Sequence, residues 1–207
     1  MANSYTTIPE LQYVAQITGV NLRGIATKDK IQQQVTGDGG YIINLQDSTE
    51  GSGTHWCCFF IQDGYGVYFD SYGGPPPQVV CGILRRRAPR GSTWSNEIVQ
   101  NLRSGYCGQY CIYFLWWVQN SRNSDTYRNS LTLKERLRSF LRQWSKDPEE
   151  NLTILRKKFL NKLKMTRGDG VGGSGLTEYG RQQILRGQVL AGNDSPLILE
   201  ELKSLNK

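Results

Sequence analysis

A buried helix is predicted by the sequence CGQYCIYFLWWVQ, which spans residues 107–119. From Ile112 to Val118 every side chain is apolar or aromatic, so this helix has almost no polar face. A helix that is apolar all round must be buried, and we expect it to be the central helix on which a sheet packs. Cys107 would then lie at the N-terminus of that helix.

Strands are predicted on the N-terminal side of this helix. Residues 41–45, 54–61 and 66–69 are rich in β-branched and aromatic side chains, which is typical of strands. The Asp63-Gly64 step between the last two predicts a hairpin. The fold expected is therefore α+β, with a mainly antiparallel central sheet packed against the buried helix that begins at Cys107.

Further helices are predicted toward both ends of the chain. Thr7 and Glu10 form a capping box around Pro9, which is tolerated in a first helical turn. Two amphipathic helices should follow the central one, over residues 131–144 and from Asp147-Pro148 onward. The other segments are a short helix at 78–84, a candidate strand at 93–99 and an ambiguous stretch at 21–34.

The length and composition indicate one domain with an appendage. The chain has 207 residues, and a glycine-rich linker begins at Gly168. We therefore divide it into a domain over residues 1–167 and a flexible tail over residues 168–207, for which the sequence indicates no role. A passive linker is the simplest interpretation, and self-cleavage near Gly173 is a second one.

Cysteine usage and hydropathy indicate a protein that is not secreted and not membrane-bound. The five cysteines are odd in number and irregularly spaced, which does not fit a disulfide framework. The first residues are polar and do not resemble a secretory signal. No apolar stretch reaches the ~18 residues that a membrane span needs. A reducing compartment is expected, where a reactive thiol stays usable.

The chain is basic, with a formal net charge of +7. Such a charge is compatible with nucleic acid, with an acidic substrate, or with ordinary solvation. Two groups of basic residues could contact DNA: one close to the 78–84 helix and one on the polar face of the last predicted helix. They are Arg85, Arg86, Arg87 and Arg90, and Arg156, Lys157, Lys158 and Lys162.

Cys107 is the candidate nucleophile. A thiol attacks a carbonyl as the thiolate, and both a helix N-terminus and a nearby imidazolium favour that form. Gly108 would leave room for a substrate backbone. The competing interpretation is a buried structural thiol, which is the more frequent fate of a lone cysteine and the one expected for Cys111.

The only histidine of the chain, His55, is the candidate base. Strand alternation puts His55 and Cys57 on one face. Asp70 follows the next strand and could orient the imidazole across the hairpin. Gln100, seven residues before Cys107, could donate its amide to a developing oxyanion. Taken one at a time, His55 fits a histidine packed in a strand, Asp70 fits a turn aspartate, and Gln100 fits a glutamine with no special role.

The combination of these motifs resembles the adenovirus-type cysteine proteases, the adenains, and within them the proteases of Maverick/Polinton elements and related viruses. The similarity covers residues 7–118 and rests on four motifs. These are Gly53-Thr54-His55-Trp56, Tyr68-Phe69-Asp70-Ser71-Tyr72-Gly73, Gln100, and Tyr106-Cys107-Gly108-Gln109-Tyr110-Cys111.

The resemblance implies a papain-like-clan fold, and His55, Asp70, Gln100 and Cys107 as catalytic residues. It also implies a cysteine endopeptidase that cleaves viral capsid or core precursors through a thioester acyl-enzyme, without cofactor or metal, in the virion and the host nucleus or cytoplasm. Adenovirus enzymes usually carry glutamate at the position of Asp70. They are activated by DNA and by a peptide linked to a cysteine before the glutamine. No cysteine falls between Cys81 and Cys107, so a peptide linked in that way is not implied.

Three alternatives stay open. A deubiquitinating or SUMO-specific isopeptidase of the same clan would use the same chemistry, although those enzymes usually hold the glutamine one residue nearer the cysteine. A non-catalytic DNA-binding packaging protein could use the same scaffold. A zinc site would need other spacing, because the sequence contains no Cys-x-x-Cys pair.

Overall fold

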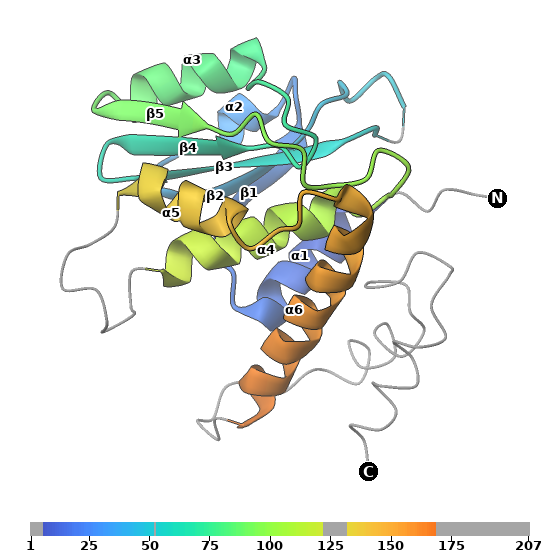
Figure 1. Cartoon of the computed structure of the whole chain (residues 1–207). Coiled ribbons are helices and arrows are strands. Elements are labelled where there is room, and N and C mark those ends of the chain that lie inside the picture. Colours follow the sequence, from blue (N-terminus) through green and yellow to red (C-terminus); the bar gives the residue numbers. More distant parts are fainter. Residues whose placement is uncertain (1–5, 52, 122–131, 169–207) are drawn as a thin grey trace.

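The computed structural model describes the backbone of residues 6–51, 53–121 and 132–168, and the side chains as far as residue 158. The chain folds into a five-stranded sheet with helices on both faces, so the predicted α+β class is confirmed (Figure 1). The strands stand in sequence order and are β1 (Leu22–Thr27), β2 (Gly39–Asn44), β3 (Trp56–Gln62), β4 (Tyr65–Phe69) and β5 (Gly91–Trp94).

The sheet is mixed, so the predicted mainly antiparallel sheet is wrong. Strands β2, β3 and β4 pair antiparallel, whereas β1 pairs parallel to β2 and β5 pairs parallel to β4. Parallel neighbours need a crossover connection. A short helix supplies it in both cases: α2 (Ile31–Gln34) lies between β1 and β2, and α3 (Gln78–Arg87) between β4 and β5.

The predicted hairpin is confirmed. Gln62 pairs with Tyr65, which leaves a two-residue turn. Asp63 and Gly64 both have positive φ angles, of 51° and 74°. Two left-handed residues make a turn whose twist matches that of the strands, and aspartate followed by glycine adopts it readily. The hairpin fixes the register between β3 and β4, and with it the positions of the residues that flank these strands.

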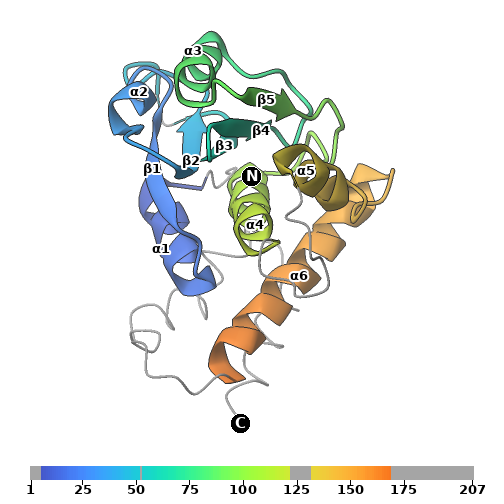
Figure 2. The ribbon, with the colours of Figure 1, turned by 90° about the vertical axis from the view of Figure 1, so that its left-hand side faces the viewer.

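Each face of the sheet has its own core. Helices α2 and α3 cover one face. The other is covered by α1 (Ile8–Thr18), α4 (Cys107–Asn120) and α5 (Leu133–Leu141), with α6 (Pro148–Gly168) beyond them. Figure 2 shows α4 between α1 and the pair α5 and α6. The residues of β3 alternate as predicted: Trp56 and Cys58 point to the α4 side, and Cys57 and Phe59 to the other.

Helix α4 is the buried central helix that the sequence predicts. Ile112, Phe114, Leu115 and Val118 have no exposed surface, and only the tryptophans at 116 and 117 are half-buried among its apolar residues. Phe114 stacks on Phe69 of β4 with ring centroids 4.7 Å apart. This packing on the sheet positions the first turn of α4, which carries Cys107.

Gly108 has a different role from the one predicted. The residue is buried, and a Cβ atom there would lie 2.6 Å from Leu11 Cδ2 of α1. The glycine therefore allows α1 to approach the first turn of α4 closely. It does not leave space for a substrate backbone.

The predicted helix starts are confirmed. The capping box of Thr7 and Glu10 opens α1, and α6 begins at Pro148 after Asp147. The predicted 93–99 strand is wrong in extent, because β5 ends at Trp94. Within the part of the chain described, no helix is long and apolar enough to cross a membrane. Of the predicted tail over residues 168–207, Gly168 is the last residue of α6, and residues 169–207 lie outside the described residues.

Candidate active site

The register of the β3–β4 hairpin brings His55 and Asp70 together. Cys58 pairs with Phe69, so the residues just beyond the strands, His55 and Asp70, lie at the same end of the hairpin. His55 Nε2 lies 2.6 Å from Asp70 Oδ1. The two residues are 9% and 4% exposed, respectively. This contact between a buried ring and a buried carboxylate is the pairing that the sequence predicts.

The predicted nucleophile lies beside the predicted base. Cys107 is the first residue of α4, and its Sγ accepts a hydrogen bond of 3.4 Å from the backbone N–H of Trp56, the residue after His55. Asp70 occupies Nε2 of the imidazole, whereas Nδ1 is buried and contacts no other nitrogen or oxygen of the protein within hydrogen-bond geometry. Nδ1 is therefore the ring nitrogen available to the thiol of Cys107.

The surroundings of His55 favour the protonated ring. Burial of the ring acts to lower its pKa, but the hydrogen bond to Asp70 and the nearby sulfur of Cys107 outweigh that effect and raise the pKa to about 9. Burial raises the pKa of three thiols, those of Cys57, Cys58 and Cys111. Those thiols stay protonated at neutral pH, so the structural role predicted for Cys111 agrees with its environment.

The segment after β4 holds Asp70 in place. The backbone N–H of Tyr72 donates to Asp70 Oδ1 at 2.8 Å, and the Tyr72 ring stacks on His55 with centroids 4.3 Å apart. A Cβ atom on Gly74 would lie 2.5 Å from Asp70 Oδ2. Because glycine has no Cβ, the chain at Gly74 can pass close to Oδ2 of the carboxylate. Sequence reasoning assigned no role to Tyr72 or Gly74.

Gln100 lies in the same network, but its amide is already engaged. The residue is fully buried. Its Oε1 accepts a 2.6 Å hydrogen bond from Ser71 Oγ, and its Nε2 donates to Ser104 O at 2.7 Å and Ser104 Oγ at 2.9 Å. A further contact of 3.3 Å joins Nε2 to Tyr72 Oη. An oxyanion would have to replace one of these acceptors before Gln100 could serve it.

Helix α6 supports the loop between Gln100 and Cys107. Asn151, which is fully buried, donates to the carbonyl of Val99 at 3.0 Å. Glu149 accepts a hydrogen bond from Asn101, and Arg156 donates to the hydroxyl of Tyr106 at 2.9 Å. These contacts fix the loop at its beginning and its end. No residue pattern predicts these contacts, because all three partners come from a helix about 50 residues farther along.

The predicted basic residues do not form one surface. Arg85, Arg86 and Arg87 are exposed in the last turn of α3, whereas α6 lies on the other side of the sheet (Figures 1 and 2). Two residues of α6 are also engaged within the protein: Arg156 contacts Tyr106, and Lys158 donates to Gln143 Oε1 at 2.7 Å. The side chain of Lys162 lies outside the described residues.

Among the described residues, one group of side chains has the composition of a metal site. Ligand atoms of His55, Cys57 and Asp70 all lie within 4.8 Å of one another. Two ligands around a tetrahedral zinc ion, each about 2.0 Å from it, stand roughly 3.3 Å apart. The 2.6 Å contact between His55 and Asp70 is shorter than that and fits a hydrogen bond. The residues in this arrangement therefore do not fit zinc.

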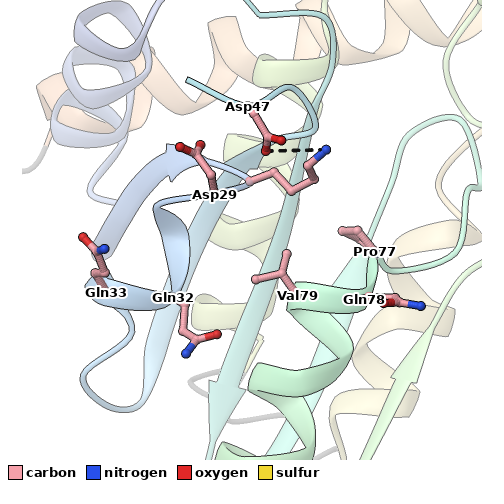
Figure 3. Close-up of a pocket in the computed structure, with 8 residues that line it drawn as sticks. Asp29, Gln32, Gln33, Asp47, Pro77, Gln78 and Val79 are labelled. Atoms are coloured by element: carbon pink, nitrogen blue, oxygen red, sulfur yellow. Dashed lines mark ion pairs between the residues drawn. The ribbon is translucent and has the colours of Figure 1, made fainter. Parts of the chain in front are cut away.

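A separate pocket of about 610 Å³ lies between α2, the start of α3 and the loop after β2 (Figure 3). Lys28 and Asp47 form an ion pair of 3.5 Å in it. Asp29 accepts hydrogen bonds from the side chain and backbone of Ser48, which lower its pKa. None of the four predicted catalytic residues lines this pocket. Its acidic groups already have partners, so it does not add to the candidate site.

The geometry thus brings His55, Asp70 and Cys107 together, with Gln100 joined to them through Tyr72 and Ser71. Comparison of the sequence with known proteins finds no family model that matches this chain and no curated protein that is significantly similar to it.

Proposed function

We propose that this protein is a cysteine endopeptidase whose nucleophile is Cys107. The observation that carries the proposal is the array at the end of the β3–β4 hairpin. The carboxylate of Asp70 holds Nε2 of the imidazole and leaves Nδ1 for the thiol. The sulfur of Cys107, at the start of a buried helix, raises the pKa of the ring and accepts a hydrogen bond from the backbone N–H of Trp56. Among common side-chain arrangements, this one suits acyl transfer to sulfur.

In the proposed reaction, the Cys107 thiolate forms a bond to the scissile carbonyl carbon. The imidazolium of His55 then donates its Nδ1 proton to the leaving amine as the carbon–nitrogen bond breaks, which leaves a thioester. Water, deprotonated by the now neutral ring, hydrolyses the thioester and restores the thiolate–imidazolium pair. Asp70 keeps its hydrogen bond to Nε2 throughout and so fixes the orientation of the ring.

The developing oxyanion has two candidate sets of donors. The first N–H groups of a helix have no partner within the helix, so the N-terminus of α4 offers donors beside the nucleophile. The amide of Gln100 is the second candidate, provided that it gives up a contact to Ser104 or Tyr72. Hydrogen bonds of this kind often rearrange when substrate binds.

By resemblance, we extend the proposal to the adenain-like branch of the papain-like clan, with capsid or core precursor proteins of a DNA virus or virus-like element as substrates. An isopeptidase acting on ubiquitin-like conjugates is the alternative with the same chemistry. Assaying glycine-containing peptides against ubiquitin-like conjugates distinguishes the two, because only the isopeptidase should prefer the conjugates.

The direct test compares variants in a peptide-hydrolysis assay. Cys107→Ala and His55→Ala should each lose at least a thousandfold in kcat/KM. Cys81→Ala is the matched control, because Cys81 is a half-buried thiol on α3 that bonds to the Pro76 carbonyl and lies outside the array. Full activity in Cys107→Ala would refute the proposal.

A further inference from the structure

Tyr72 contacts three of the four predicted catalytic residues. Its ring is nearly parallel to the imidazole of His55, with an angle of 15° and centroids 4.3 Å apart. Its backbone N–H donates to Asp70 Oδ1, the same oxygen that contacts His55 Nε2. Its hydroxyl accepts from Gln100 Nε2 at 3.3 Å. The fourth residue, Cys107, follows the loop that contains Gln100 and Ser104, and the Tyr72 hydroxyl bonds to both of these residues.

The hydroxyl of Tyr72 spans the gap between the hairpin and that loop. It donates to the carbonyl of Ser104 at 3.2 Å, three residues before Cys107. Tyr72 belongs to the segment that leaves β4, and Ser104 to the segment that enters α4. One half-buried side chain therefore joins the His55–Asp70 pair to the segment that carries Gln100 and Cys107.

We propose that Tyr72 is a positioning residue that aligns the two halves of the site, its ring fixing the plane of His55 and its hydroxyl fixing the amide of Gln100. This inference rests on the proposed peptidase function. The ring and the hydroxyl make separate contributions. An aromatic face against the imidazole restricts its rotation and favours its protonated form. The hydroxyl is one of three acceptors around Gln100 Nε2, and the other two belong to Ser104.

The two contributions can be separated by substitution. Tyr72→Phe keeps the ring and removes the hydroxyl, whereas Tyr72→Leu keeps apolar bulk and removes the ring. Because His55 is the only histidine, its imidazole signals can be followed by NMR through a pH titration without ambiguity. Asp70 and Cys107, the titratable groups that raise the pKa of His55, are unchanged in both variants.

We expect Tyr72→Phe to leave the His55 signals and titration midpoint at wild-type values. Tyr72→Leu should shift the imidazole protons downfield, because the ring current of the tyrosine is lost. It should also lower the midpoint by roughly half a pH unit. A structural role alone would reduce thermal stability and leave the imidazole signals of the folded protein in place. Wild-type signals in folded Tyr72→Leu would overturn the inference.

A double-mutant cycle in the peptidase assay tests the hydroxyl. Tyr72→Phe should reduce kcat roughly three- to tenfold with little change in KM, as expected for loss of one hydrogen bond to a group that serves the transition state. In a Gln100→Ala background the same substitution should lose most of its effect, because only the bond from the Tyr72 hydroxyl to Ser104 O is then left to remove. Ser71→Ala is the matched control, since Ser71 bonds the other end of the same amide. Ser71→Ala should have no effect on kcat in the Gln100→Ala background, and it should leave the His55 signals unchanged.

The outcomes separate this inference from the proposed function. Additive effects of Tyr72→Phe and Gln100→Ala would overturn the role of the hydroxyl. A wild-type protein that hydrolyses no peptide would refute the proposed function. The NMR titration needs no activity, so unchanged His55 signals in Tyr72→Leu would refute the positioning role in either case.

Discussion

Replacing Gly74 by alanine should separate Asp70 from His55 without changing any charge. The added Cβ would lie 2.5 Å from Asp70 Oδ2, whereas ordinary contact begins at 3.4 Å. Either the carboxylate or the backbone must therefore move by about 0.9 Å (3.4 − 2.5). Gly74 does not have a positive φ angle, so the substitution introduces this contact and no backbone strain.

Movement of the carboxylate would break the hydrogen bond to the imidazole. A displacement of this size directed away from the ring would lengthen the 2.6 Å distance between His55 Nε2 and Asp70 Oδ1 to about 3.5 Å (2.6 + 0.9), which is beyond hydrogen-bond range. The pKa of His55, about 9, should then fall toward its ordinary value of 6.5, because the bond to Asp70 is the main interaction that raises it. A misplacement of about 1 Å in a catalytic group can reduce kcat by roughly a hundredfold.

The assay is the NMR titration of His55, combined with kcat for peptide hydrolysis. Gly37→Ala is the matched control, because a Cβ atom there would meet nothing within 4 Å and its φ angle is not positive. We expect Gly37→Ala to behave as wild type in both measurements. A folded Gly74→Ala protein with a titration midpoint near 9 and wild-type kcat would show that the close approach of Gly74 to Asp70 does not control the His55–Asp70 pair.

Three further predictions concern stability. The pKa of His55 is raised from 6.5 in the unfolded chain to about 9 in the folded protein. The protonated ring therefore stabilises the folded protein fully below pH 6.5, and this stabilisation is lost as pH rises to about 9. In urea titrations the free energy of unfolding should fall by up to about 3 kcal/mol over that window, and Asp70→Asn should make the fall smaller. Phe140→Ala should lower the free energy of unfolding by about 3–5 kcal/mol in the same assay, since this fully buried ring packs edge-on against Phe69 and Phe114 in the core on the α4 side. A decrease under about 1 kcal/mol would contradict that packing. Gly108→Ala should lower the free energy of unfolding by about 1–3 kcal/mol, because its Cβ would overlap Leu11. Unchanged stability would mean that α1 moves to accommodate the Cβ without destabilising the fold.

The elements that the sequence predicted are those whose signals are local. A capping box opens α1, an aspartate–glycine turn joins β3 to β4, and an uninterrupted apolar run marks α4. Because the hairpin turn fixes the register, it also made the meeting of His55 with Asp70 predictable. The edge strands were harder. Their direction depends on crossovers through α2 and α3, and β5 has four residues with little burial.

The parts of the site that the sequence did not reveal depend on long-range contacts. Gln100 was found by its spacing from Cys107, but the engagement of its amide by Ser104 and Tyr72 follows from how the loop folds back. The role of Gly74 depends on its distance from a carboxylate four residues earlier, which no residue pattern encodes. Asn151 acts from a helix that packs on the loop only in the folded chain.

The central claim is that Cys107 reacts as a thiolate paired with the imidazolium of His55. The most direct measurement is the rate of iodoacetamide modification at each cysteine as a function of pH, read by peptide mass spectrometry, in wild type and in His55→Ala. We expect Cys107 alone to react rapidly well below pH 8, and this reactivity to disappear in His55→Ala. Slow modification of Cys107 at pH 6, or rapid modification that survives the loss of His55, would contradict it.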